Sequence, residues 1–571
     1  MNYSRPHATV PSATADTTPS WRWLVLMCVA YLLPGIVGHD PWKPDEAYIF
    51  GSIYHMIQSG DWVVPYVGGE PFVEKPPLFH WVAVLLAKTA APVLPLHDGA
   101  RLASTLFVAI SLIAVAFAAR VTWGRGHGRY AILLSLSSLG LVEHAHMMLP
   151  DLPLMAGIAL AVAGFAAGAR RLPWAGLLVG AGAGMGFLAK GLIAPGIVGA
   201  MAVALPLFFR DWRHRAYVRL LVLAALSALP WLIAWPTALY LRSPDLFRLW
   251  YWDNNIGRLL GFSVPYLGAE KEPGFFWNTS PWFLFPGWIF AALTLWRQGS
   301  RGWHQPAVQI AGALLLSMCL LLGFSASARA VYLLPMIVGV ALLGSGAADM
   351  VPAWIDRALA AIGILIGFVA LVLFWLVWGT MIASGHAPDW PWLTRWLPAD
   401  FVMPISPLEV TVAIALTVGA MAAIAKTVGR RGNGLLVWTL ALTLAWGLTT
   451  TLWLPWIDSA RSYRAVFESL ALTLPRDATC ISSRGVGEGE RSMLEYIAKL
   501  RTQREEVFGS PACPVLLVES KATADLPPDE PWALMWSGAR LGDARESFQL
   551  YRFDSRDIPP VAAIRRHHPK S

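Results

Sequence analysis

"GGEPFVEKPPLFHW", residues 68–81, decides how the whole chain is placed. This stretch gathers two glutamates, a lysine, a histidine and three prolines, and it leads into an apolar run at 77–96. A helix that spans a bilayer needs about 20 mostly apolar residues, so the run has the length of a span. If it crosses a membrane, every loop that follows changes side. The topology therefore depends on this one segment.

The rest of the chain is mostly apolar. Of its 571 residues, 56% are hydrophobic and only 14% are charged, and the mean hydropathy is +0.51. Further apolar runs of membrane-spanning length occur near 21–39, 102–119, 131–149, 152–169, 173–190, 192–209, 217–240, 281–297, 306–323, 330–349, 357–383, 406–425 and 433–455. We therefore predict a polytopic α-helical membrane protein with about 13 transmembrane helices. The net charge of +8 indicates no nucleic-acid partner, because lysines and arginines cluster in short loops between the apolar runs.

The positive charges favour one placement of run 77–96. When the run is left outside the membrane, the basic loops fall on the cytoplasmic side, as the positive-inside bias requires. These loops hold Arg120, Arg125, Arg129, Arg170, Arg171, Arg210, Arg213, Arg215, Arg219, Arg297, Arg301, Lys426, Arg430 and Arg431. We therefore expect residues 73–96 to lie on the outer membrane surface, with Trp62, Phe72, Phe79 and Trp81 among the lipid headgroups.

This topology brings several separate segments to one extracytoplasmic face. They are residues 40–100, the turn around Asp151, the loop 241–280, the turn 324–329, the loop 384–405 and the C-terminal region. We expect the chemistry of the protein on that face.

Three parts of the chain differ in composition. We expect a disordered cytoplasmic tail at 1–20, a transmembrane domain at 21–456 and a small extracytoplasmic α/β domain at 457–571. The last part contains the strand-like runs "CPVLLVES" and "FQLYRF" and the helical stretch "RSMLEYIAKLRTQREE". Cys480 and Cys513 both fall there, and they can pair if the domain faces an oxidising compartment.

Acidic residues at the starts of two expected helices are candidate catalytic groups. Asp45 and Glu46 follow Pro44, where a carboxylate can act either as a helix cap or as a catalytic group, and both interpretations are open. Asp151 stands between two prolines at the rim of the apolar runs, where an unpaired carboxylate is costly. We expect Asp45 and Asp151 to be catalytic.

Cations and polar groups on the same face are candidate substrate ligands. Each cation alone is typical of a residue that reaches for the membrane interface, but together they describe a site for a lipid phosphate. The predicted substrate-binding residues are Glu46, Glu74, Lys75, Arg258, Arg329 and Tyr332.

Two other kinds of motif are missing or incomplete. The sequence shows no Cys-x-x-Cys pair or Cys/His cluster, so we expect no metal, and it shows no cofactor motif. "GAGAGMGFLAKG", residues 180–191, lacks the Ser or Thr that a phosphate loop has after its lysine, here Lys190. Close packing of helices through small residues is the better interpretation of this glycine run.

A known family shares several of these stretches. The sequence from "PDEAYIFGSIYHMIQSGDWVVPYVGGEPFVEKPPLFHW" to "ARLASTL", with "LPDLPL", "GFLAKG" and "YLLP", resembles the dolichyl-phosphate-mannose–protein mannosyltransferase-like GT-C superfamily. Within it, the chain is most similar to the bacterial lipid A aminoarabinose transferases, over most of residues 20–350. The resemblance implies functional roles for Asp45, Lys75, Asp151 and Arg258. The aromatic–Asp–Arg–Asp–Glu opening of that group reads "WKPDEA" here.

The resemblance implies an inverting glycosyltransferase in the bacterial inner membrane. Its donor would be a polyprenyl-phosphate-linked sugar, and its acceptor lipid A or another glycan of the cell envelope. Lys75 and Arg258 would stabilise the negative charge that develops on the leaving phosphate. Asp45 would act as base for a hydroxyl acceptor, whereas a phosphate acceptor needs only orientation.

Three alternative functions are open: a protein O-glycosyltransferase, a glycan receptor and a transporter. A transporter is expected to show repeated halves and ionisable groups near the bilayer midplane. Here the charges gather at one rim, and no repeat is visible. A receptor would bind its ligand without needing the charge of Asp45 for a reaction.

The topology can be tested with reporter fusions. A reporter fused after Arg129 is expected to be cytoplasmic, and one fused after Asp458 extracytoplasmic. The opposite pair of results would contradict both the placement of 77–96 and the shared outer face.

Overall fold

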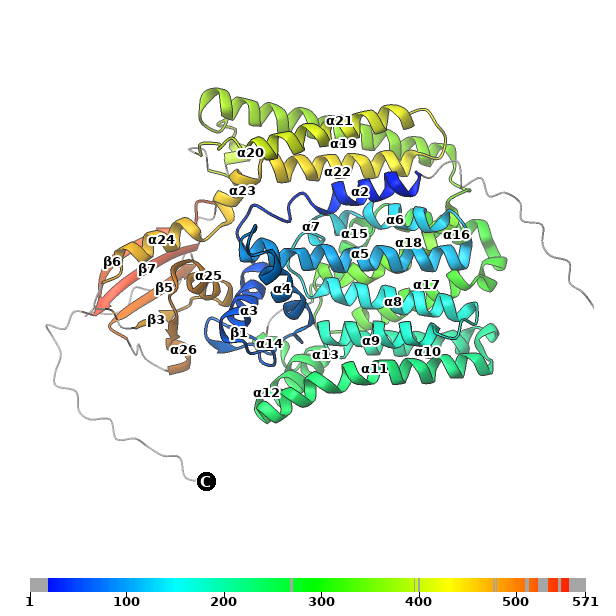
Figure 1. The fold of residues 1–571 in the computed structure, drawn as a ribbon, viewed down its shortest axis with the longest axis horizontal. Coiled ribbons are helices and arrows are strands. Elements are labelled where there is room, and N and C mark those ends of the chain that lie inside the picture. Colours follow the sequence, from blue (N-terminus) through cyan, green and yellow to red (C-terminus); the bar gives the residue numbers. More distant parts are fainter. Residues whose placement is uncertain are drawn as a thin grey trace, which may run out of the picture.

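The structure is a computed structural model that describes residues 19–267, 271–394, 396–398, 401–475, 478, 480–508, 513–521, 532–542 and 546–553. Helices lie side by side in a broad bundle, and a smaller domain with a β-sheet sits against one end of that bundle (Figure 1). The tail predicted at 1–20 lies almost wholly outside the described residues. The expected class, a helical membrane protein with a small C-terminal α/β domain, is confirmed.

Among the described residues, eight helical stretches are long and apolar enough to cross a membrane by length and composition. They are α5 (Leu96–Trp123), α8 (Asp151–Ala169), α11 (Arg215–Arg242), α17 (Pro306–Phe324), Ala330–Ala347 with α18 (Leu334–Gly344) at its centre, α19 (Ala353–Ser384), α21 (Pro407–Thr427) and α22 (Gly434–Leu452). Shorter apolar helices are α2 (Trp21–Leu32), α4 (Leu78–Ala90), α9 (Ala175–Lys190) and α10 (Ile193–Phe208). The count of thirteen spans stays a prediction.

Shorter helices connect these elements. They are α3 (Asp45–Ser59), α6 (His127–Leu136), α7 (Leu139–His144), α12 (Pro244–Arg248), the π-helical η2 (Leu249–Gly257), α13 (Arg258–Leu260), α14 (Val264–Leu267), α15 (Phe275–Phe283), α16 (Gly287–Gln298) and α20 (Pro391–Thr394). Single 3-10 turns are η1 (Arg210–Trp212), η3 (Gly299–His304), η4 (Ala330–Leu333) and η5 (Ser345–Ala347). A two-stranded hairpin, β1 (Tyr66–Val67) with β2 (Glu70–Pro71), lies in the first loop.

The glycine run at 180–191 packs helices together, as predicted. A Cβ on Gly182 would come within 2.3 Å of the Gly157 carbonyl oxygen on α8, and one on Gly180 within 2.1 Å of the Ala224 carbonyl oxygen on α11. Only glycine allows such close contact, so α9 lies tightly between its two neighbours. This packing fixes Lys190, the last residue of α9.

Run 77–96 does not form one long span. Its helix α4 has 13 residues, about 20 Å at 1.5 Å per residue, which is shorter than the hydrocarbon core of a bilayer. It lies by α3 at the end of the bundle near the small domain (Figure 1). The indole Nε1 of Trp81 donates to the Trp62 carbonyl oxygen at 2.8 Å, which ties α4 to the first loop. These features support the interfacial placement of the segment, but Phe79 is fully buried in the protein and does not lie among the headgroups.

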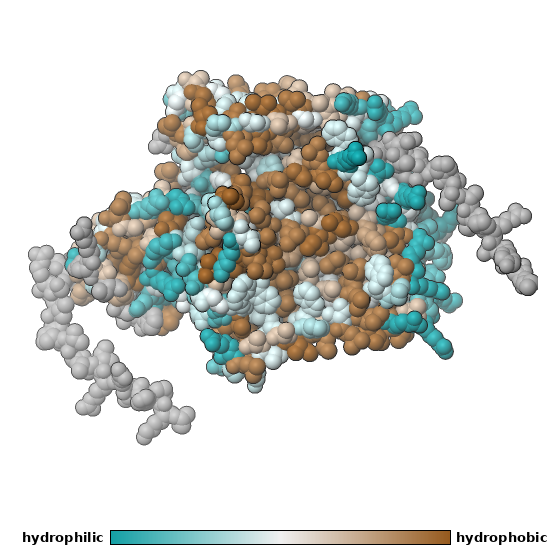
Figure 2. Space-filling model, viewed as in Figure 1, coloured by the Kyte–Doolittle hydropathy of each residue, from teal (hydrophilic) through white to brown (hydrophobic). Residues whose placement is uncertain are grey.

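Polar residues separate to the two ends of the bundle. Hydrophobic residues cover its middle, and hydrophilic residues gather at one end and over the small domain at the other (Figure 2). At the end away from the small domain, the Arg129 guanidinium donates to the Pro19 carbonyl oxygen at 2.9 Å. Arg129 and the N-terminal segment thus share one end, as the predicted topology requires.

The C-terminal domain contains a mixed five-stranded sheet of order β4-β3-β5-β7-β6. Strand β3 runs parallel to β4 and β5, and β7 runs antiparallel to β5 and β6. The strands are β3 (Ile481–Arg484), β4 (Thr502–Arg504), β5 (Val515–Lys521), β6 (Trp532–Ala539) and β7 (Glu546–Phe553), and the helices are α23 (Leu454–Arg461), α24 (Arg464–Thr473), α25 (Glu488–Ala498) and α26 (Glu505–Phe508).

Both predicted strands are present, but the predicted helix at 491–506 is displaced. Helix α25 begins earlier, at Glu488, and ends at Ala498. Lys499 follows in the left-handed conformation with φ 59°, and its Nζ donates to the Tyr54 hydroxyl at 2.9 Å. The contact with α3 thus holds Lys499 where the helix ends, a tertiary effect that local periodicity does not reveal.

Cys480 and Cys513 form a disulfide, with Cα atoms 5.5 Å apart and a sequence separation of 33 residues. Closing a loop of that length is expected to stabilise the domain by about 3–4 kcal/mol. Cys480→Ser should therefore lower the free energy of unfolding by about that amount, measured by proteolysis of the C-terminal domain in urea. Cys319→Ser, which removes a free cysteine in α17, is the control. Equal stability of the two variants would contradict the prediction.

Candidate functional site

Asp45 begins α3, but it does not cap that helix. Its carboxylate accepts two hydrogen bonds from the Arg329 guanidinium, at 2.9 and 2.6 Å, and a third from the Tyr48 hydroxyl at 3.0 Å. Helix α3 has no side-chain cap. Burial alone would raise the Asp45 pKa, but the Arg329 hydrogen bonds and charge outweigh it, so the pKa is lowered. The capping interpretation therefore has no support.

Glu74, in the first loop, forms ion pairs with two cations. Its Oε1 lies 2.8 Å from Lys75 Nζ and 2.8 Å from Arg258 Nη1. Burial opposes the charge of Glu74, but Lys75 and Arg258 outweigh it and lower its pKa to about 2. Lys75 Nζ also donates to the Tyr48 hydroxyl at 3.1 Å. Tyr48 thereby connects this group of charges to Asp45.

Asp151 forms a second carboxylate–lysine pair at the rim of the bundle. Its Oδ1 lies 2.6 Å from Lys190 Nζ, and both side chains are buried. The same ammonium lies 3.9 Å from the centroid of the Tyr332 ring, a cation–π contact. Like Asp45, Asp151 begins its helix without capping it.

A cavity of about 640 Å³ connects these groups. Its charged and hydroxyl lining comes from the first loop, the starts of α3 and α8, the end of α9, Arg258, residues 272–279, the segment 329–332 and the start of α25. These residues are Asp45, Tyr48, Glu74, Lys75, Asp151, Lys190, Arg258, Glu272, Thr279, Arg329, Tyr332 and Glu488. The contacts confirm that these distant segments share one face, as the topology predicts.

A narrower cavity of about 190 Å³ shares the cations of the first. Both cavities are lined by Glu74, Lys75, Lys190, Arg258 and Tyr332. The remaining lining of the narrower cavity is mostly apolar and includes Leu154, Ile193, Ile197, Met318, Leu321 and Leu322. A polar chamber therefore continues into an apolar channel between α8, α10 and α17.

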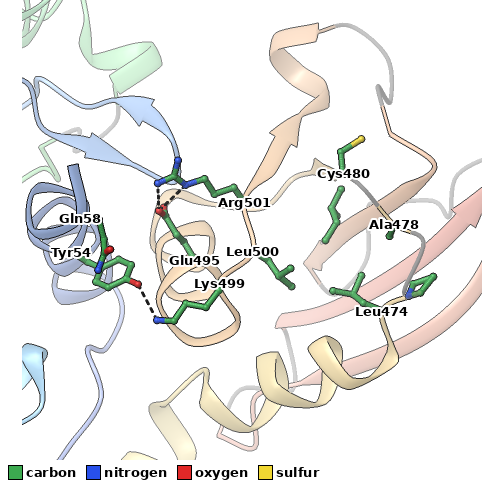
Figure 3. Close-up of a pocket in the computed structure, with 11 residues that line it drawn as sticks. Tyr54, Gln58, Leu474, Ala478, Cys480, Glu495, Lys499, Leu500 and Arg501 are labelled. Atoms are coloured by element: carbon green, nitrogen blue, oxygen red, sulfur yellow. Dashed lines mark hydrogen bonds and ion pairs between the residues drawn. The ribbon is translucent and has the colours of Figure 1, made fainter.

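Another cavity, of about 630 Å³, lies where α3 meets the C-terminal domain (Figure 3). Its charged groups are paired with neighbours across or along the wall: Lys499 with Tyr54 at 2.9 Å, and Arg501 with Glu495 at 2.7 Å. Asp45, Lys75 and Asp151 do not line it. We therefore take the chamber around Asp45 as the candidate site.

Seven of the eight predicted site residues line this chamber, and Glu46 does not. Glu46 is fully buried beside the chamber, where it pairs with Arg101 Nε at 2.8 Å and accepts from the Met148 amide at 3.0 Å. Neighbouring residues of a helix point about 100° apart, so Asp45 and Glu46 face different surroundings. These contacts give Glu46 the position of a buried structural ion pair outside the chamber.

Sequence reasoning missed Tyr48, Lys190, Glu272 and Glu488. Tyr48 lies one helical turn after Asp45, a spacing that places both on one face of α3 and was visible in the sequence. Lys190 ends the glycine run, and a single lysine at the end of an apolar helix gives no local signal of a site. Glu488 comes from the C-terminal domain, and burial with the nearby charge of Glu74 raises its pKa.

The sequence is similar to those of several known proteins. Residues 74–235 match the family described as dolichyl-phosphate-mannose-protein mannosyltransferase. An undecaprenyl phosphate-α-4-amino-4-deoxy-L-arabinose arabinosyl transferase of Pseudomonas fluorescens is 27% identical over 73% of this chain and 73% of its own length. A transferase of the same name from Pseudomonas paraeruginosa is 28% identical over 57% of this chain and 58% of its own.

Solved structures agree on the fold. The crystal structure of ArnT from Cupriavidus metallidurans bound to undecaprenyl phosphate superimposes with a TM-score of 0.69. The match covers 93% of this chain and 98% of that one, at 17% identity. The apo structure of the same protein gives a TM-score of 0.67. In sequence and in fold, the chain thus resembles the membrane glycosyltransferases of the GT-C type.

Within that class, the chain resembles the bacterial lipid A aminoarabinose transferases. The expectation drawn from the first loop and from "LPDLPL", "GFLAKG" and "YLLP" is therefore confirmed as a resemblance.

Arg329 is expected to set the acid limit of activity through Asp45. In the native protein the pKa of Asp45 is lowered, so Asp45 stays ionised, and transfer should persist, at acid pH where an ordinary aspartate is already becoming protonated. In Arg329→Gln the ion pair is lost and burial remains, so the Asp45 pKa rises and the acid limb moves to higher pH. Transfer rates measured against pH for both proteins test this. Superimposable acid limbs would contradict the pairing.

Proposed function

We propose that the protein transfers a sugar from undecaprenyl phosphate, or a closely similar polyprenyl phosphate, to a phosphate group of lipid A at the periplasmic face of the bacterial inner membrane. The observation that carries this proposal is the junction of the two cavities. Lys75, Arg258 and Lys190 stand where the polar chamber meets the apolar channel. A lipid with an anionic head and a hydrocarbon tail fits that sequence of surroundings.

The first step is donor binding. The first isoprene units of the prenyl chain lie in the channel of about 190 Å³ between α8, α10 and α17, and the phosphate lies by Lys75 and Arg258. The Tyr332 ring contacts Lys190, and the Tyr332 hydroxyl can donate a further hydrogen bond to the phosphate. The sugar then projects into the chamber, toward Asp45 and Asp151. The relatives named above carry undecaprenyl phosphate-linked 4-amino-4-deoxy-L-arabinose in their names, and this sugar is our first candidate.

The second step is displacement at the anomeric carbon. An acceptor oxygen forms a bond to that carbon, the bond from the carbon to the phosphate oxygen breaks, and its electron pair leaves with the polyprenyl phosphate. The leaving phosphate gains negative charge, which Lys75 and Arg258 stabilise more strongly than they stabilise the donor. Attack from the face opposite the leaving group inverts the configuration of the sugar.

The low pKa of Asp45 favours a phosphate acceptor. A strongly ion-paired carboxylate is a weak base, and an efficient general base has a pKa near the working pH. A phosphate oxygen is already anionic and gives up no proton, so only its orientation is needed. Arg329 supplies a cation for that purpose, because its side chain is 37% exposed while it holds Asp45. Asp45 and Asp151 then stabilise positive charge that develops on the sugar.

A protein hydroxyl is the second candidate acceptor. The matched family description names a protein mannosyltransferase, and the match includes Lys75, Asp151 and Lys190. A serine or threonine acceptor must lose a proton during the reaction, and Asp45 would have to accept it. Mass spectrometry of lipid A and of envelope proteins from a strain that lacks the gene separates the two acceptors.

Lys75 and Asp45 are expected to fail in different ways. Lys75→Ala should weaken donor binding and lower transfer, with a total loss of about 2–4 kcal/mol in transition-state stabilisation. Lys75→Arg should recover only part of it, because a planar fork places its protons differently from an ammonium. Asp45→Asn should abolish transfer and leave donor binding intact, because the phosphate ligands remain.

The measurement is sugar transfer from purified polyprenyl-phosphate donor, alongside binding of the same donor. Lys88→Ala, which removes an exposed lysine of α4 outside the chamber, is the matched control and should behave like the native protein. Normal sugar transfer by the Asp45→Asn protein would show that the charge of Asp45 is not needed for the reaction and that its role is structural. Donor binding without transfer by the native protein would favour a receptor.

A further inference from the structure

Lys43, two residues before Asp45, is held by the C-terminal domain. Its Nζ forms an ion pair with Glu490 of α25 and lies 2.5 Å from Glu546 Oε1 of β7. The two carboxylates are almost completely buried, with side-chain exposures of 2% and 6%. The lysine side chain thus crosses from the first loop into an acidic pocket of another domain.

The pocket is completed by further polar groups of the same domain. Arg540 Nη2 lies 2.6 Å from Glu546 Oε2, and the Tyr463 hydroxyl donates to Glu546 Oε1 at 3.0 Å. Glu490, Glu519 and Glu546 present oxygens within 4.8 Å of one another, a spacing that also suits a metal ion. Lys43 lies beside Glu490 and Glu546, and Arg540 lies beside Glu546. Without these cations, several buried carboxylates so close together would be costly, because their negative charges repel.

Close backbone packing surrounds the same contact. A Cβ on Gly489 would come within 3.2 Å of the Ala47 side chain, and one on Gly51 within 2.2 Å of the Ser492 hydroxyl. Helices α25 and α3 therefore lie against each other with little room to slide. The segment before Lys43 is also fixed, because Asp40 pairs with Arg464 at 2.5 Å and the Trp42 indole donates to Asp458 at 2.7 Å.

We propose that Lys43 is a positioning residue, through which the C-terminal domain fixes the first turn of α3 and holds the Asp45 carboxylate in the reaction chamber. The catalytic role of Asp45 rests on the proposed function, whereas the contact of Lys43 with the C-terminal domain does not depend on it. Only Pro44 separates the anchored residue from Asp45, so movement of Lys43 reaches the carboxylate almost undiminished. Lys43 does not line the chamber, whereas Pro44 and Asp45, the two residues that follow it, do.

The test compares Lys43→Met, Lys43→Arg and Glu490→Gln with the control Lys88→Met in the full-length protein. Lys43→Met keeps most of the side-chain volume and removes the charge. We expect kcat to fall by about 10- to 100-fold, the size of effect that a misplacement near 1 Å produces, with undecaprenyl phosphate binding unchanged. Lys43→Arg should recover most of the rate, since it keeps a cation in the acidic pocket. Lys88→Met should transfer at the native rate.

A double variant distinguishes one shared positioning effect from independent damage at two sites. Glu490→Gln alone should also lower kcat, and Lys43→Met with Glu490→Gln should be no slower than the slower single variant. Multiplied losses would show that the two residues act independently and would overturn the proposal. Loss of donor binding together with kcat in Lys43→Met would also overturn it, because the phosphate ligands lie elsewhere.

Hydrogen exchange gives a readout that needs no activity. The Ala47 amide donates to the Trp42 carbonyl oxygen at 3.2 Å, so it reports on the first turn of α3. In Lys43→Met its exchange should become faster, while exchange in β3 and β5, which Lys43 does not contact, stays as in the native protein. Native exchange at Ala47, or faster exchange throughout the sheet, would overturn the anchor. If the native protein transfers no sugar, the proposed function fails, and hydrogen exchange still decides whether Lys43 is an anchor.

Discussion

The site depends on one carboxylate shared by two cations. Lys75, in the first loop, and Arg258, at the start of α13, are far apart in the sequence, and without Glu74 between them their charges would repel in a buried place. One carboxylate and two cations together carry a net positive charge, so the donors that would bind a phosphate are already in position. Preorganised charge of this kind costs no reorganisation during a reaction. The Tyr48 hydroxyl extends the same arrangement to Asp45, and the site becomes one connected set of charges.

The sequence predicted this set to a large extent, because the bilayer imposes strong rules. Once the basic loops are placed on one side of the membrane, Lys75, Asp151, Arg258 and Arg329 fall together on the other, whatever the packing of the helices. The short helix α4 and the glycine contacts of α9 follow equally simple rules, namely length against bilayer thickness and small residues at helix contacts.

What the sequence did not reveal depends on tertiary contacts. Glu46 was expected in the site beside Asp45, yet the helical turn directs it to Arg101 instead. Lys190 looked like an ordinary residue at a helix end until the structure placed it between Asp151 and Tyr332. Helix α25 was expected to begin three residues later, and so Glu488 at its start was not considered as part of a cavity. These cases share one cause, that local patterns do not specify partners.

Helix α25 also has a consequence for how the protein is made. The chamber is bounded on one side by Glu488, whereas Asp45, Lys75 and Asp151 are synthesised hundreds of residues earlier. The last helix of the bundle, α22, ends at Leu452, so the bundle is complete before Glu488 is added to the lining of the chamber. The wall closes only after the ribosome has completed α25 and the strands that hold it. Order of synthesis thus keeps the growing chain from presenting a finished reaction chamber before its last domain has folded.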